Sequence, residues 1–289
     1  MAVVLALCSA LAYGFSDFLG GILSRRTSAW SVAVVAQTSS AACTGLVALF
    51  VHGDPAPAHF WWAVLAGVGS GMGTGFLYRG FSAGRMGVVA PVSAVGAALV
   101  PVLTGVVTGE RPALLVWVGV VAALPAIWLV SSPPPDPPAG PSPSPSALAP
   151  GGLTAAGLTD GVLAGLGFGL LFAALGQVPG SAGWWPLALC QTVSIPSVAL
   201  LATVLGAAWL PRRRTALVAT LAGPLGATAT GLFLLASQRG FLTVAGVLAS
   251  LYPASTVLLA AVLLHEKVHR AQGVGLGLCA LAVVLVAGG

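Results

Sequence analysis

Ten apolar stretches, each about as long as one membrane crossing, follow one another along the 289-residue chain. A helix needs about 20 apolar residues to span the hydrocarbon core of a bilayer. Only 6% of the residues are charged, whereas a soluble domain carries about 25%. The chain therefore has too few charges to cover a water-facing surface. These features predict an all-α membrane protein with ten transmembrane helices.

The predicted spans cover residues 2–23, 30–51, 60–80, 86–108, 112–131, 153–175, 184–209, 215–237, 242–264 and 270–288. Short loops connect them, with one exception. Residues 131–152 read SSPPPDPPAGPSPSPSALAPGG, a Pro/Ser-rich stretch that favours a solvated, semi-extended linker. We accordingly divide the chain into a first five-helix repeat (1–131), a linker (132–152) and a second five-helix repeat (153–289).

The two halves resemble each other in sequence. A shift of 156 residues places Glu110 on Glu266 and Thr74 on Thr230. At a slightly smaller shift, Gln37-Thr38 matches Gln191-Thr192. Polar residues are scarce here, so these matches are informative. Because each repeat has an odd number of spans, the second must enter the membrane upside down. The sequence thus predicts two inverted five-helix repeats, a construction common among secondary transporters.

The basic residues lie mostly in loops on one side of the predicted bundle. That side, which follows the odd-numbered spans, holds Arg25, Arg26, Arg85, Arg212, Arg213, Arg214 and Lys267. The opposite loops hold only Arg111 and Arg239. The positive-inside rule makes the first side cytoplasmic and places both termini outside. No continuous basic face indicates a nucleic-acid partner.

Three stretches resemble the EamA-like family of the drug/metabolite transporter superfamily. They are YGFSDFLGGILSRR in the first span, APVSAVGAALVPVLTGVVTGERP (90–112) and LASLYPASTVLLAAVLLHEKV (248–268). The resemblance implies a multi-pass protein of the plasma (inner) membrane that moves small organic solutes. It departs at His265, where glycine is usual before the glutamate. Family members are generally drawn with cytoplasmic termini, opposite to the charge distribution, so orientation stays open.

From these features we predict a secondary transporter, an exporter of small organic metabolites or drugs by alternating access. Its partners are the lipid bilayer and a small-molecule solute. Coupling to protons and assembly as a homodimer remain open. No enzyme activity, cofactor or metal is expected.

Asp17 is the strongest candidate for coupling. A charged side chain at the centre of a span costs about 2.5–3.5 kcal/mol on insertion scales, so such residues face the bundle interior or hold a proton. Tyr13 and Ser16 share the face of Asp17 by helical spacing. The alternative is an interfacial or structural role beside Arg25 and Arg26, although eight residues of helix separate Asp17 from Arg25 by about 12 Å.

The candidate substrate and coupling-ion residues are Asp17, Tyr13, Ser16, Gln37, Tyr78, Ser93, Gln191, Thr230 and Tyr252. Ser93 and Tyr252 lie in spans interrupted by Pro91, Pro101 and Pro253, and interrupted helices often line transporter sites. The alternative for Ser, Thr and Gln is helix–helix hydrogen bonding, worth about 0.6 kcal/mol. The alternative for Tyr78 is an interfacial anchor.

Two further patterns predict structure. Glu110 and Glu266 follow the fourth and ninth spans and are expected to cap or pair at the starts of the fifth and tenth. Glycines recur every four residues at 157, 161, 165 and 169, and again at 67, 71 and 75. Such stripes let helices approach closely.

HEKVH (265–269) matches the zinc-protease signature H-E-x-x-H. An intramembrane zinc enzyme is therefore an alternative function, but no convincing third ligand follows His269. A membrane scaffold without transport activity is another alternative.

Overall fold

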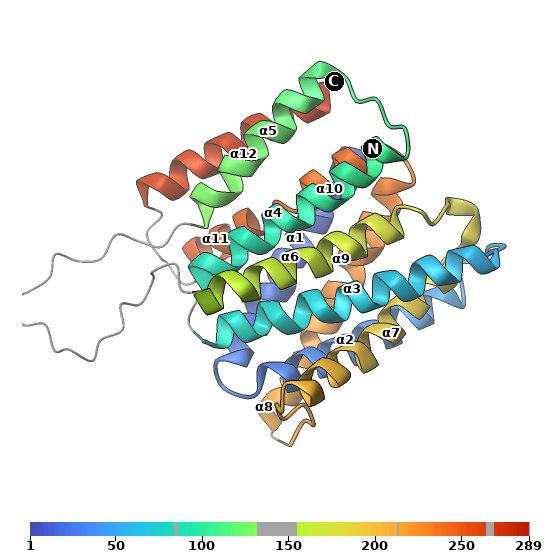
Figure 1. Cartoon of the computed structure of the whole chain (residues 1–289), viewed down its shortest axis with the longest axis vertical. Coiled ribbons are helices and arrows are strands. Elements are labelled where there is room, and N and C mark those ends of the chain that lie inside the picture. Colours follow the sequence, from blue (N-terminus) through green and yellow to red (C-terminus); the bar gives the residue numbers. More distant parts are fainter. Residues whose placement is uncertain (84–85, 132–154, 213, 264–268, 289) are drawn as a thin grey trace, which may run out of the picture.

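The computed structural model describes residues 1–83, 86–131, 155–212, 214–263 and 269–288, and these residues form helices and connecting loops without a strand. Figure 1 shows the α-helices packed side by side in one bundle. They are α1 (Ala2–Ser24), α2 (Ala29–Ala48), α3 (Pro57–Ser82), α4 (Met86–Val107), α5 (Leu114–Val130), α6 (Ala155–Leu175), α7 (Trp185–Val204), α8 (Arg214–Leu217), α9 (Ala222–Ser237), α10 (Leu242–Ala249), α11 (Tyr252–Leu263) and α12 (Arg270–Gly288). Two 3₁₀ turns, η1 (Gly180–Ala182) and η2 (Val218–Leu221), complete the order.

Within the described residues, nine helical segments are long and apolar enough to cross a membrane. The segment α8–η2–α9 counts as one span, and so does the apolar part of α10–α11, Leu242–Leu259. The apolar α5 is shorter, at 17 residues. The all-helical prediction with about ten spans is therefore confirmed for this part of the chain.

Two predicted helix ends are wrong. The second span was expected to reach residue 51 and the seventh residue 209, but α2 ends at Ala48 and α7 at Val204. Apolar residues continue beyond both helices, and hydropathy alone does not mark a helix end. After α7 the chain turns at Gly206, whose φ of 66° is left-handed and favours glycine.

The ninth span is broken into α10 and α11. Ser250 and Leu251 separate the two helices, and Pro253 lies in the first turn of α11. Proline has no amide hydrogen, so the carbonyl of Ala249 loses the helical partner that residue 253 would supply. Pro91 and Pro101, in contrast, remain inside a single helix, α4.

The main helix–helix contacts come in equivalent pairs: a contact between two helices is matched by a contact between their counterparts, each in the opposite half. In chain order, α1–α5 correspond to α6, α7, α8–α9, α10–α11 and α12. α6 packs on α3 and α4, and its counterpart α1 packs on α9 and on α10–α11. α7 packs on α3 as α2 packs on α9, and α5 pairs with α12.

The glycine stripes are packing surfaces, as predicted. A Cβ on Gly165 would lie 3.1 Å from the Cα of Gly96 in α4. On the other side of α6, a Cβ on Gly167 would lie 2.8 Å from the carbonyl oxygen of Gly69 in α3. Helix backbones thus touch nearly directly on both sides of α6.

Large apolar side chains cover much of the outside of the bundle. Leu103, Val121, Leu200 and Val284 are each more than 60% exposed. Lipid tails would satisfy this surface, because exposed apolar side chains are ordinary in a bilayer. In Figure 1 the α5–α12 pair lies at the edge of the bundle.

Candidate functional site

A polar cavity lies inside the bundle, between α1, α2, α3, α6, α7 and α9. All of the predicted site residues except Ser93 and Tyr252 line it: Tyr13, Ser16, Asp17, Gln37, Tyr78, Gln191 and Thr230. The space open to the centres of water molecules is about 30 Å³, enough for one or two waters. The cavity is therefore narrow in this conformation.

Asp17 is 6% exposed and lines this cavity. Among the described residues none forms a hydrogen bond or an ion pair with its carboxylate. The alternative of an ion pair with Arg25 or Arg26 is not seen. Tyr13 and Tyr78 line the same cavity as Asp17, and Tyr252 packs against the Tyr13 ring.

Glycines on α1 allow the neighbouring elements to reach Asp17. The Tyr78 ring from α3 lies where a side chain on Gly20 would stand, and its hydroxyl is 3.5 Å from the carbonyl oxygen of Ser16. Gly14 likewise lies against the start of α11. A Cβ added to Gly14 would lie 3.1 Å from the carbonyl oxygen of Tyr252. Tyr78 is 1% exposed, so it is a cavity residue and not an interfacial anchor.

Equivalent residues of the two halves make equivalent hydrogen bonds at the cavity wall. Gln37 on α2 donates through Nε2 to Thr74 Oγ1 on α3, at 3.1 Å. Gln191 on α7 donates through Nε2 to Thr230 Oγ1 on α9, at 3.3 Å. The glutamines matched in the sequence comparison, and so did the threonines. Tyr13 Oη joins the second pair, 3.1 Å from Thr230 Oγ1.

Two buried oxygen atoms on the cavity wall have no hydrogen-bond partner within the described structure. They are Gln191 Oε1 and Ser40 Oγ. Gln191 is 2% exposed and Ser40 is 1% exposed. A buried polar atom without a partner is unfavourable, so both atoms mark places where a ligand or water is needed.

Ser93 and Tyr252 lie beside the cavity and not on its wall. Their hydroxyls are 2.5 Å apart and connect α4 to α11. The Tyr252 ring packs 6.5 Å from the Tyr13 ring and 6.3 Å from the Phe168 ring, measured between centroids. The Ser93–Tyr252 pair therefore supports the rings of Tyr13 and Phe168, which line the cavity.

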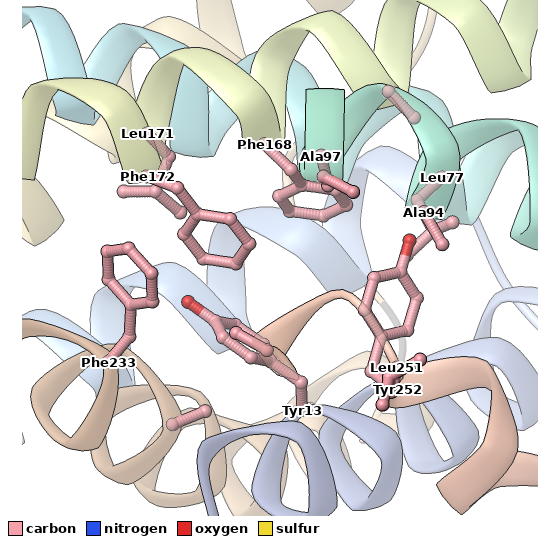
Figure 2. Packing of buried hydrophobic residues seen from close by; sticks show 14 of the residues in the cluster. Tyr13, Leu77, Ala94, Ala97, Phe168, Leu171, Phe172, Phe233, Leu251 and Tyr252 are labelled. Carbon is pink, nitrogen blue, oxygen red and sulfur yellow. The ribbon is translucent and has the colours of Figure 1, made fainter. Parts of the chain in front are cut away.

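Sequence reasoning missed the aromatic cluster beside the cavity. Figure 2 shows Phe168 and Phe172 pointing from α6 toward Tyr13 and Phe233. Phe172 and Phe233 stack at 4.2 Å, and Tyr13 meets Phe172 edge-on at 5.7 Å. In a chain rich in apolar residues, phenylalanines carry no signal that separates a cavity wall from a lipid-facing surface.

Contacts between the halves close the bundle at both ends. At one end, Ser28 and Ser31 donate hydrogen bonds to the carbonyl oxygens of Ala208 and Leu210, at 2.5 and 3.2 Å. At the other end, the amide of Asp54 donates to the carbonyl oxygen of Ser181 at 2.8 Å. The two contacts are equivalent. When each loop is replaced by the corresponding loop of the other half, the first pair of loops becomes the second pair.

Two other carboxylates join the halves away from the cavity. Asp160 on α6 is 1% exposed and forms an ion pair with Arg79 on α3, with Arg79 Nε 2.7 Å from Asp160 Oδ1. Glu110 accepts hydrogen bonds from the amides of Leu242 and Thr243, at 2.5 and 2.9 Å. Glu110 therefore caps a helix start, but that of α10 instead of the predicted α5. Glu266 lies outside the described residues.

The HEKVH motif lies outside the described residues except for His269. Among the described residues, no three or more His, Cys, Asp or Glu side chains are grouped so that they could hold a metal ion.

Comparisons with known proteins place this geometry in context. One solved crystal structure, described only as that of a protein, has a TM-score of 0.65 and 16% sequence identity, covering 96% of this chain and 98% of its own. At that identity the match shows the fold alone. A search of curated proteins finds no match. The model of the EamA-like transporter family matches residues 1–132. The first half of the chain is thus similar to the EamA-like transporter family, the family that the sequence motifs indicated.

Proposed function

We propose that the protein is a secondary transporter of small organic solutes and that the central cavity is its solute site. The supporting observation is that polar side chains from both halves converge in one buried cavity of a largely apolar bundle. Polar groups inside a membrane are costly and mark solute or ion pathways. Transporter sites of this kind lie near the midplane, between structural repeats.

We further propose that the halves are inverted repeats that work by alternating access. The equivalent helix contacts of the two halves support this arrangement, and so do the equivalent Gln–Thr hydrogen bonds. The small cavity, with room for one or two waters, then corresponds to a solute-free state in which loop contacts hold both ends together, and the site widens to admit a solute. Opening one seal at a time would expose the site to one side of the membrane.

Asp17 is proposed to couple transport to protons. It is buried, lines the cavity and lacks a fixed partner, so a proton can occupy it when the solute is absent. With the arginine-rich loops in the cytoplasm of a plasma membrane, an inward proton gradient would drive solute export. A screen for metabolites that accumulate in cells lacking the protein tests the direction and names the solute.

The test of coupling uses purified protein in liposomes with an imposed pH gradient. We expect Asp17→Asn to abolish the pH dependence of solute flux, because the amide cannot bind and release a proton. The matched control is Asp54→Asn, which changes an exposed aspartate in the loop after α2. Circular dichroism and gel filtration check that both variants fold.

Unchanged pH dependence in Asp17→Asn would remove the coupling role from this residue. Absence of any solute flux in the wild-type protein, across cationic, neutral and anionic solutes, would contradict the transporter function itself.

A further inference from the structure

We infer that the cavity selects a protonated amine, a solute with one positive charge and several hydrogen-bond donors. This inference rests on the proposed transport function and specifies its substrate class. Charge, hydrogen-bonding capacity and ring placement around Asp17 each support it.

Charge is the first argument. Asp17 is the one Asp, Glu, Lys, Arg or His residue among those lining the cavity. No cationic side chain among the described residues offsets its carboxylate, because the nearby Arg79 is paired with Asp160. An uncompensated buried charge is strongly unfavourable. A cationic solute would supply the missing partner, whereas an anionic solute would be repelled.

Hydrogen-bonding capacity is the second argument. The amide groups of Gln37 and Gln191 already donate to Thr74 and Thr230. On the cavity wall, the unpartnered buried atoms are Gln191 Oε1 and Ser40 Oγ, which can accept as well as donate, and the Asp17 carboxylate is a further acceptor. A primary ammonium group carries three donors and no acceptor. Its donors match the free acceptors, whereas a carboxylate or phosphate would add acceptors to a site that already has a surplus.

Ring placement is the third argument. Tyr13, Tyr78 and Phe168 line the cavity, and Tyr252 packs against two of them. Aromatic faces attract cations, more strongly where water is excluded, and they also pack against apolar carbon chains. The solute therefore combines an ammonium group with an apolar body.

Asp17 then serves the solute and the proton in turn. The titratable groups that face it are Tyr13 on its own helix, Tyr78 from α3 and Tyr252 from α11. Of the other helices packed on α1, α2 carries only Cys43 as a titratable side chain, and α9 and α10 carry none. One ammonium ion leaves as one proton binds, so the exchange is electroneutral.

A matched panel of solutes tests the class. Thermal unfolding of the purified protein in detergent is measured with n-butylamine, n-butanol and butyrate, and with benzylamine, benzyl alcohol and benzoate. We expect the amines to raise the melting temperature and the alcohols and carboxylates to leave it unchanged. The amine effect should be larger at pH 8 than at pH 6, because protons compete for the same carboxylate.

Variants assign the effect to the cavity. Asp17→Asn should lose the amine response, while the exposed control Asp54→Asn keeps it. If Asp17→Asn does not fold, Gln191→Leu provides the second test. It removes one acceptor and should weaken benzylamine binding about tenfold, the usual effect of losing a hydrogen bond to a charged group.

Three results would overturn the inference: a response to carboxylates or alcohols as large as that to amines, no response to any amine, or an amine response that persists in Asp17→Asn. Flux of the same six solutes into liposomes tests the amine inference separately from the proposal that the protein is a transporter. Protein-dependent flux of butyrate or butanol without amine binding would refute the amine class and leave the transporter function standing.

Discussion

At the scale of single residues, α1 shows why one polar face can exist in an apolar helix. Its glycines face neighbouring elements, while Tyr13, Ser16 and Asp17 line the cavity. Gly20 makes room for the Tyr78 ring, and Gly14 for the start of α11. Asp17 lies between them and lines the cavity. The position of the carboxylate thus depends on residues that have no side chain.

We expect Gly20→Ala to displace Tyr78 and to reduce solute flux. Overpacking of this kind costs about 1–3 kcal/mol, which a lower melting temperature would report. The matched control is Gly45→Ala in α2, where an added Cβ would meet nothing within 4 Å. Alanine is the better helix former by about 1 kcal/mol, so the control should be neutral or stabilised. Equal effects of both substitutions would show that the contact with Tyr78 is unimportant.

Residue type predicted most of the polar residues on the cavity wall, but it could not predict which residues pair with each other. Gln37, Gln191 and Thr230 were recognisable because polar residues are rare in this chain and are costly in lipid. Ser93 was placed on the site, yet it pairs with Tyr252 behind the wall. That pairing joins residues 159 positions apart, and no local pattern encodes it.

At the scale of elements, the break between α10 and α11 positions Tyr252 beside the cavity, and Glu110 holds the start of α10 from the other half. Glu110 accepts three hydrogen bonds there, one of them from the Thr243 hydroxyl at 2.6 Å. The loop motif predicted a cap, because a carboxylate is favourable at a helix N-terminus. It did not predict which helix is capped, since that depends on how the halves pack.

Replacing Glu110 should therefore loosen contact between the halves. We expect Glu110→Ala to lower stability by about 1–2 kcal/mol, the usual cost of losing a helix cap. Arg111→Ala, at an exposed neighbour, is the control. Chemical denaturation in detergent measures both. A Glu110→Ala protein as stable as the control would show that the cap contributes nothing to folding.

At the scale of the whole molecule, the loops close both ends of the bundle at once. Hydropathy located the helices well, because crossing length and low charge are visible in any window of the chain. It could not locate these seals, which consist of hydrogen bonds to backbone carbonyls such as those of Ala208 and Ser181. Carbonyl groups are common to all residues and leave no trace in a sequence.

Cross-linking either seal should stop transport. We expect the double variant Ser31→Cys/Leu210→Cys to lose solute flux on oxidation and to recover it on reduction. Asp54→Cys/Ser181→Cys should behave in the same way at the opposite end. The single-cysteine variants control for effects of substitution. Continued flux in fully cross-linked protein would show that these loops need not separate.

The glycine contacts of α6 have a mechanical consequence. With its backbone against Gly96 on one side and Gly69 on the other, α6 has little freedom to tilt alone and must travel with α3 and α4. By the same reasoning, α1 travels with α9 and α11, to which Ser9, Ser16 and Gly14 attach it. Each of these packed groups therefore combines helices from both halves of the sequence. The units that the packing holds together are thus not the two continuous halves of the chain.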